Sequence, residues 1–201
     1  MNGRWTDPLV PATDGHTRLD DDAMRGLKPA WIRTRGDLNG AEQQNILNVV
    51  ATRHPPTIEE LLTDGYLRGL HRAMFSDVWT WAGTYRRTNP NIGCDWHQIT
   101  VNVRSLLDDV KYWIEQSTCA ADEVAVRFHH RLVFIHPFPN GNGRHSRLAA
   151  NYLVTALKAG PLTWGSELNL PTSELRNIYI GALRLADSES DFSALVTFAK
   201  N

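Results

Sequence analysis

Apolar residues recur every three or four positions over most of this chain, and that spacing limits its fold more than any other feature. Between residues 99 and 116 the recurring positions are Val103, Leu106, Leu107, Val110 and Ile114. A period of three to four residues is that of a helix with one buried face. The same spacing returns at residues 122–135, 144–157, 172–186 and 191–200. We therefore predict a mainly α fold.

Capping residues and prolines set the bounds of the earlier helices. The apolar spacing predicts a helix from about Gly40 to Arg53, which the following proline pair ends. Thr57 and, three residues later, Glu60 have the spacing of a capping box, so the next helix begins there. This second helix is expected to break or bend near residues 64 and 65, an Asp-Gly pair.

The segment from residue 79 to residue 98 has a different composition. Trp, Thr and Tyr surround an Asn-Pro pair and a later glycine. This mixture favours a short β-hairpin or an ordered loop near residues 85–98. The aromatic side chains of Trp79, Trp81 and Tyr85 are expected to pack beneath it rather than to stack on nucleic-acid bases.

Length and composition indicate one globular domain. The chain has 201 residues, of which 42% are hydrophobic and 21% charged, enough for a sizeable core. Its first 30 residues are rich in Pro, Asp and Gly. We predict an N-terminal arm over residues 1–37, lying on a single domain over residues 38–201.

Charge and cysteine usage exclude several classes of protein. The formal net charge is −1, which lacks the basic excess of most nucleic-acid-binding domains. Cys94 and Cys119 have the spacing of neither a metal site nor a disulfide framework. The N-terminus lacks the apolar core of a signal peptide, and no segment approaches the roughly 18 apolar residues of a membrane span. We expect a cytoplasmic protein that binds neither nucleic acid nor membrane.

Residues 136–143 combine a histidine with a glycine-rich turn. Pro137 disfavours helical geometry at His136, so the preceding helix should end there and present the imidazole at its C-terminal edge. Gly141, Asn142 and Gly143 allow backbone N–H groups to converge on an anion. The helix that follows adds the N–H groups of its own first turn. The sequence therefore predicts a local anion site.

Two arginines begin that following helix. Arg144 and Arg147 are three residues apart, so they share a face, repel each other and oppose the helix dipole. A bound polyphosphate would resolve both conflicts; alternatively, acidic neighbours pair with the arginines and the glycines only make a tight turn. A Walker loop is excluded because Arg144-His145 follows the last glycine, and a dinucleotide fingerprint would need Gly at Ser146.

His129 and His130 precede this turn on the same predicted helix. They suggest a metal pair with His136, but adjacent helical residues point to different faces and no acidic ligand is spaced with them. We predict partly buried histidines with satisfied hydrogen bonds.

The string HPFPNGNGRHSR at residues 136–147 resembles the signature of Fic-domain proteins, HxFx(D/E)GNGRxxR, at all fixed positions but one. TWAGTYRRTNPNIG resembles the Fic segment that leads into the target-docking flap, and RFHHRLVFIHPF resembles the helix that feeds the motif. The likeness runs from about Leu38 to Phe198, and within the family the chain is most similar to the group labelled mobile mystery protein B. It implies a helical bundle with a short β-hairpin flap.

The resemblance also implies an activity, the transfer of AMP from ATP to a Ser, Thr or Tyr hydroxyl of a target protein. His136 would be the general base, and Phe138 would anchor the loop in the core. Asn91, Ile92 and Gly93 would form the flap that aligns the target by strand addition. The nucleotide-binding residues would be Gly141, Asn142, Gly143, Arg144 and, for the γ-phosphate, Arg147.

One position departs from the family pattern. Asn140 stands where Fic proteins usually have Asp or Glu to hold Mg²⁺, and an amide offers a carbonyl oxygen without charge. Asn140 is thus expected to be at most a weak metal ligand, with ATP bringing its own Mg²⁺. The alternatives are a nucleotide-binding pseudoenzyme or regulator and a Fic-type phosphotransferase.

Many Fic proteins are inhibited by a helix that carries (S/T)xxxE(G/N). In this chain TRGDLN has Leu38 in place of the Glu, and TWGSEL has Leu168 in place of Gly or Asn. Neither string is a clean match, so the sequence does not support self-inhibition and leaves a separate inhibitory partner as an alternative.

Overall fold

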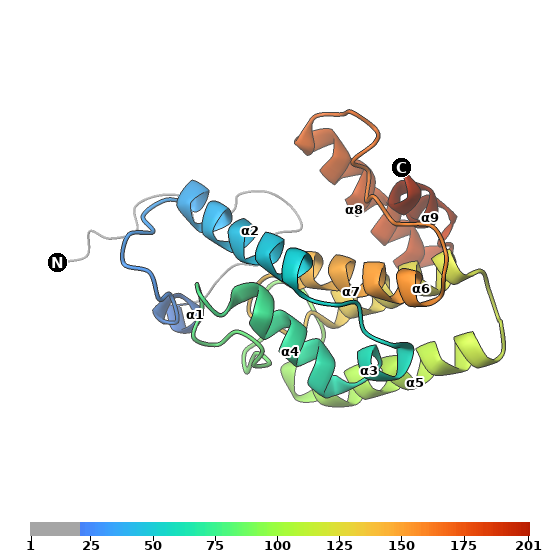
Figure 1. The fold of residues 1–201 in the computed structure, drawn as a ribbon, viewed down its shortest axis with the longest axis horizontal. Coiled ribbons are helices and arrows are strands. Elements are labelled where there is room, and N and C mark those ends of the chain that lie inside the picture. Colours follow the sequence, from blue (N-terminus) through green and yellow to red (C-terminus); the bar gives the residue numbers. More distant parts are fainter. Residues whose placement is uncertain (1–20) are drawn as a thin grey trace.

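The computed structural model of the chain describes residues 21–201 and is helical through most of that range (Figure 1). A short 3₁₀-helix, Trp96–Gln98, precedes α5. The α-helices of the described range are α1 (Asp21–Arg25), α2 (Arg35–Thr52), α3 (Ile58–Leu61), α4 (Asp64–Phe75), α5 (Ile99–Glu115), α6 (Ala121–Ile135), α7 (Asn142–Ala156), α8 (Thr172–Glu189) and α9 (Ser193–Lys200).

Helices α6 and α7 form the centre of the molecule. Helix α5 packs on α6, while α3 and α4 pack on α7. Helix α2 lies over α4 on one side, and the α8–α9 pair closes the other side through α9 and α6 (Figure 1). The turn between α6 and α7 therefore lies among several helices. Fully buried side chains of this core include Leu70, Val103, Leu106, Phe128 and Leu153.

The predicted helices are confirmed, with one shifted start. Helix α2 begins at Arg35 and not near Gly40, because Thr34 and Asp37 form a capping box ahead of it. The side chain of Thr34 accepts from the Asp37 N–H at 3.1 Å. The second predicted capping box, Thr57 with Glu60, begins α3 as expected.

The β-hairpin expected near residues 85–98 is absent from this segment, which is an ordered loop ending in the 3₁₀-helix. Within residues 21–201, β-pairing is limited to an isolated bridge between Leu27 and Trp79. The reason lies in the loop's own hydrogen bonds. The side chain of Arg86 bonds the carbonyls of Thr88 and Cys94, and these bonds pin the loop without a strand ladder.

Residues 1–20, most of the predicted N-terminal arm, lie outside the described residues. The predicted domain boundary, residues 37 and 38, falls inside α2. Between residues 21 and 201, no helix has the length and apolar character needed to cross a membrane. Cys94 and Cys119 are free thiols.

Candidate active site

His136 caps the C-terminus of α6 in the left-handed conformation, with a φ of 54°. Its N–H donates to the Leu132 carbonyl at 3.1 Å and thus closes the last turn. Its Nδ1 lies 3.1 Å from the Val133 carbonyl oxygen. A carbonyl only accepts, so Nδ1 carries the proton and Nε2 carries the lone pair. This is the tautomer in which Nε2 can accept a proton.

The imidazole of His136 is held in its neutral form. The residue is only 6% exposed. This burial lowers the pKa of His136 to about 4, and the Arg86 guanidinium also lowers it, while the hydrogen bond to Val133 opposes the shift. Gly93 lies directly against it, since a Cβ on Gly93 would be 2.6 Å from the His136 Cβ. A larger residue at position 93 would displace the histidine.

The turn after His136 is closed by one asparagine. The Asn142 side chain accepts from the Phe138 N–H at 2.9 Å and donates to the Phe138 carbonyl at 2.8 Å. Gly141 has a φ of 77°, and a Cβ there would be 2.5 Å from the Phe75 ring. Both the conformation and the close ring require glycine. The predicted cradle is thus a single compact turn.

His71 of α4 fixes the other side of this turn. Its Nδ1 accepts from the Gly83 N–H at 3.0 Å, so its Nε2 carries the proton and donates to the Asn140 carbonyl, also at 3.0 Å. Its ring stacks on Phe138 with centroids 3.7 Å apart. Burial holds the pKa of His71 well below its usual range, so these bonds persist at neutral pH.

The first turn of α7 faces the end of this loop. Hydrogen bonding along α7 begins with the His145 N–H, which donates to the Gly141 carbonyl at 2.9 Å. The N–H groups of Asn142, Gly143 and Arg144 therefore make no bond along the helix, as at any helix start. Such groups, with the helix dipole, favour an anion. The anion site predicted from the sequence would lie at these N–H groups, and it stays a prediction.

The two arginines of α7 have different surroundings. Arg144 Nη2 is 2.7 Å from Glu42 Oε2, and its guanidinium lies 5.1 Å from the centre of the Phe75 ring. An acidic neighbour thus pairs with Arg144, which was the alternative left open by the sequence. Glu42 belongs to α2, far from the motif in the chain.

Arg147 has no such acid among the described residues. Its guanidinium lies 4.4 Å from the ring centre of Tyr179, on α8, and 5.8 Å from that of Trp164. Its buried Nε has no hydrogen-bond partner. A cation over aromatic faces, with an unsatisfied buried donor, is poised for an anionic ligand.

Residues 85–95, here called the flap, are anchored by Arg86. Its side chain is buried and donates to backbone carbonyls of the flap and of the end of α6. These acceptors are the carbonyls of His136 at 2.7 Å, Cys94 at 2.6 Å, Thr88 at 2.8 Å and Ile135 at 3.2 Å. Because helix carbonyls at a C-terminus carry partial negative charge, a buried cation is well placed there. Gly93 is therefore held against His136, and Asn91 and Ile92 precede it in the flap.

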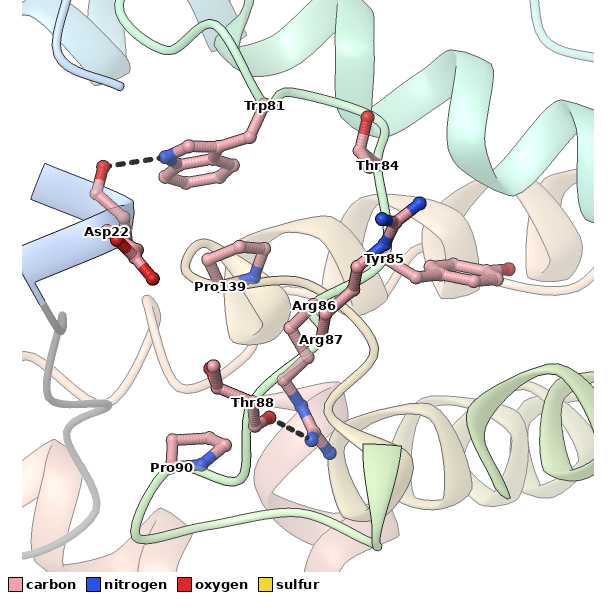
Figure 2. Close-up of a pocket in the computed structure, with 10 residues that line it drawn as sticks. Asp22, Trp81, Thr84, Tyr85, Arg86, Arg87, Thr88, Pro90 and Pro139 are labelled. Atoms are coloured by element: carbon pink, nitrogen blue, oxygen red, sulfur yellow. Dashed lines mark hydrogen bonds between the residues drawn. The ribbon is translucent and has the colours of Figure 1, made fainter. Parts of the chain in front are cut away.

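Two cavities flank the flap. The first, of about 270 Å³, lies between the flap, α1 and the motif loop, and includes Trp81, Pro90 and Pro139 (Figure 2). The second, of about 320 Å³, is bounded by flap residues 91–93, by Val133 and Phe134 of α6, and by side chains of α8. Flap residues therefore line both cavities, and only the second cavity includes residues of α6.

The remaining sequence predictions concern histidines and aromatic residues. His129 and His130 are both buried; His129 bonds the Tyr179 hydroxyl at 3.0 Å, while His130 bonds Asp187 at 2.8 Å. The Nδ1 atom of each has no hydrogen-bond partner, so the predicted satisfaction holds for one ring nitrogen of each and is wrong for the other. In the part of the chain that the structure describes, no three or more His, Cys, Asp or Glu side chains form a group that could hold a metal ion. Trp79 is buried and stacks on Trp81 at 4.8 Å, which confirms the packing role.

Comparison with known proteins identifies the class. Residues 61–154 match the model of the Fic/DOC family, and this segment contains the whole turn, both arginines and the flap. The chain therefore carries a Fic/DOC-family domain. The narrower likeness to the mobile mystery protein B group stays a prediction.

Solved structures agree in fold. BepC from Bartonella tribocorum, determined with bound AMPPNP, is 18% identical with a TM-score of 0.65, over 87% of this chain and 90% of that one. The N-terminal Fic domain of a putative cell filamentation protein from Bartonella quintana is also 18% identical at 0.65, over 85% and 84%. Fic-1 from C. elegans is 22% identical at 0.59, over 79% of this chain but 46% of that one.

Sequence reasoning missed three residues of this site, namely Glu42, His71 and Arg86. Each acts through a partner distant in the chain, Glu42 being 102 residues from Arg144. A helix pattern marks positions as apolar or polar but does not say which polar residue is buried. The Arg-Arg pair at 86 and 87, just before an Asn-Pro turn, was the one local signal available.

Proposed function

We propose that this protein is a protein adenylyltransferase, which transfers AMP from MgATP to a hydroxyl side chain of a target protein. The observation that carries the proposal is the juxtaposition of a neutral His136, whose Nε2 is the unprotonated ring nitrogen, with a helix start whose N–H groups favour an anion. Phosphoryl-type transfer asks mainly for positioning and charge neutralisation. The Fic/DOC family match supports this reaction class.

In this proposal the turn and α7 hold the triphosphate. The backbone N–H groups of Gly143 and Arg144 donate to the inner phosphates. The Arg147 guanidinium leaves the aromatic rings that it contacts and binds the γ-phosphate. Asn142 acts through its side chain, which keeps the turn closed. The bound AMPPNP of the related BepC structure supports a nucleotide as ligand.

The nucleoside part fits the cavity beside the flap. At about 320 Å³, the cavity bounded by residues 91–93, α6 and α8 has the size of a small-molecule site. Val133, Phe134 and Leu183 provide apolar surface for a base. The flap then covers the nucleotide on one side and presents its outer edge to a target peptide.

The chemical step transfers one proton and replaces one bond to the α-phosphorus by another. The target hydroxyl gives its proton to His136 Nε2, its oxygen bonds to the α-phosphorus, and the bond from that phosphorus to the bridging oxygen breaks, releasing pyrophosphate. The negative phosphates raise the pKa of His136 from its value of about 4, because a nearby opposite charge favours the imidazolium. Nucleotide binding thereby makes His136 a better base.

Magnesium enters as part of the MgATP substrate. His71 bonds only the backbone carbonyl of Asn140, and the side-chain amide of Asn140 offers an oxygen without charge, so Asn140 would be at most a weak metal ligand. The Mg²⁺ is therefore held mainly by the phosphates.

A nucleotide-binding pseudoenzyme is the second candidate, and the neutral residue at position 140 favours it. A single experiment separates the candidates. Purified protein is incubated with a cell lysate and either α-labelled or γ-labelled ATP. AMP transfer puts α-label on a protein, phosphotransfer puts γ-label there, and a pseudoenzyme transfers neither.

Two variants identify the residues responsible. His136→Ala should abolish α-label transfer while ATP binding, measured by calorimetry, stays nearly intact, since a base acts on the chemical step. Arg147→Ala should weaken ATP binding. Transfer of γ-label alone, or undiminished transfer by His136→Ala, would refute the proposed reaction.

A further inference from the structure

Glu42 is a buried carboxylate outside the segment that matches the Fic/DOC model. It lies on α2 and is 1% exposed, yet its two oxygens have two different partners. Oε1 accepts from Trp79 Nε1 at 2.6 Å, and Oε2 accepts from Arg144 Nη2 at 2.7 Å. A buried carboxylate persists only with such partners. Both of its oxygens are therefore committed.

The surroundings of Trp79 fix the position of the Glu42 carboxylate. Trp79 is buried and stacked on Trp81, and its backbone pairs with Leu27, so the indole N–H cannot move to follow Glu42. Because Glu42 Oε1 is bonded to this fixed indole N–H, the position of Glu42 Oε2 is fixed as well. That position defines where the Arg144 guanidinium lies.

Arg144 is thereby held on two sides. Its side chain is 37% exposed, which would leave an unpaired arginine free to sample many rotamers. Here Glu42 binds one nitrogen and the ring of Phe75 supports the guanidinium plane at 5.1 Å. An arginine has five N–H donors in a rigid fork, so donors remain for an anion.

We propose that Glu42 is a positioning residue for the nucleotide's phosphates, acting through Arg144; this inference rests on the proposed function. The ligand class is a polyphosphate at the start of α7. Glu42 orders Arg144 before the ligand arrives, so that binding does not have to immobilise a long side chain. The opposite role, a carboxylate that competes with phosphate for Arg144, predicts the opposite sign in every measurement below.

The test is a double-mutant cycle on ATP affinity. Calorimetry with ATP and Mg²⁺ is done in the His136→Ala background, which prevents turnover. Glu42→Gln keeps size and polarity but has a single acceptor for two donors, so it should weaken ATP binding about ten-fold. In proteins that already carry Arg144→Ala, Glu42→Gln should have no further effect, because the two residues act as one unit. Gln43→Ala, at the exposed neighbouring position of α2, should leave the affinity unchanged.

Two results would overturn the positioning role. One is unchanged or tighter ATP binding by Glu42→Gln. The other is an equal loss of ATP affinity from Glu42→Gln in proteins with Arg144 and in proteins with Arg144→Ala, because a general disturbance of the fold would add to the effect of Arg144→Ala. If Glu42→Gln does not fold, Glu42→Asp keeps the charge but shortens the side chain, and a several-fold loss that disappears in the Arg144→Ala background is expected from it.

The outcome is distinguishable from failure of the proposed function. If Arg147→Ala weakens ATP binding and Glu42→Gln does not, the nucleotide site stands and the role of Glu42 falls. If neither Arg147→Ala nor Arg144→Ala weakens ATP binding, the phosphate site itself is wrong, and with it both proposals.

Discussion

The turn at residues 137–143 and the flap at residues 85–95 meet at His136, but they are held in place differently. The turn is fixed by buried side chains from other helices, including His71 of α4 and Asn142 at the start of α7. The flap depends largely on Arg86, one of its own residues, which bonds carbonyls of the flap and of α6. A turn held by several buried side chains suits a phosphate site, and a flap held largely through one side chain suits a segment that admits a target.

The difference extends to titration. The turn is surrounded by neutral buried histidines, with the pKa of His136 and that of His145 both lowered to about 4 by burial. The flap ends instead at Asp95, an exposed carboxylate whose pKa is lowered by its hydrogen bonds with His97 and Asn89. Acid should therefore act on the turn before it acts on the flap.

The largest predicted effect is acid destabilisation of the turn. A histidine with a folded pKa of about 4 and an unfolded pKa near 6.5 stabilises the fold fully above pH 6.5, and this contribution is lost as the pH falls toward 4. At pH 5, His136 and His145 should each cost about 2 kcal/mol of unfolding free energy relative to pH 7. Urea unfolding at both pH values measures the change.

The control is His145→Gln, in which the amide can replace the Nε2 donor to the Leu67 carbonyl but cannot titrate. This variant should lose about 2 kcal/mol less between pH 7 and pH 5 than the wild type. Equal losses in the two proteins would mean that His145 does not contribute to the acid sensitivity of the fold.

The second prediction removes the anchor of the flap. Arg86→Ala leaves several carbonyls without their donor and should lower the unfolding free energy by about 2 kcal/mol. Arg86→Lys should fall between this variant and the wild type, because an ammonium keeps the charge but lacks the planar fork. Trypsin should cleave after Arg87 faster in Arg86→Ala.

Arg87→Ala is the matched control, since Arg87 is the exposed neighbour and should change stability by less than about 0.5 kcal/mol. Equal effects of the two alanine variants would show that the flap is not held by Arg86. Destabilisation by Arg86→Ala without faster cleavage would place the effect in α6 instead of the flap.

Sequence reasoning located the helices because apolar spacing is a local signal, and α2, α3 and α4 also have capping side chains of their own. Thr57 with Glu60 and the proline pair that follows α2 are local signals, and the structure bears them out. The hairpin failed for the opposite reason. Whether residues 85–95 pair as strands depends on which carbonyls accept hydrogen bonds from the Arg86 side chain. Two of these acceptors, the carbonyls of Ile135 and His136, lie 49 and 50 residues away in the chain.

The candidate site shows the same division. His136 and Arg147 could be named as candidates because both belong to one short motif, on either side of the glycine turn in the chain. The acid that pairs with Arg144 could not be named, because α2 carries Glu42 among other polar residues and only packing selects it. The sequence therefore could not predict that Arg144 pairs with a carboxylate while Arg147 lies over an aromatic ring. This difference decides which of the two positive charges is already compensated within the protein.

The smallest predicted effect concerns Asn140, where the turn departs from the family pattern. A carboxylate beside a phosphate-bound cation adds favourable Coulomb energy that an amide cannot supply. Asn140→Asp should therefore lower the Mg²⁺ concentration for half-maximal AMP transfer by about three-fold, less than 1 kcal/mol. His71 bonds the backbone carbonyl of Asn140 and not its side chain, so the turn should keep its shape.

Titrating Mg²⁺ against transfer rate measures the midpoint, with Asn48→Asp, on the exposed face of α2, as a control for added charge. A midpoint that is unchanged, or raised because the new carboxylate repels the phosphates, would mean that position 140 does not touch the metal and that asparagine is there for the turn, where Asn before Gly is favoured.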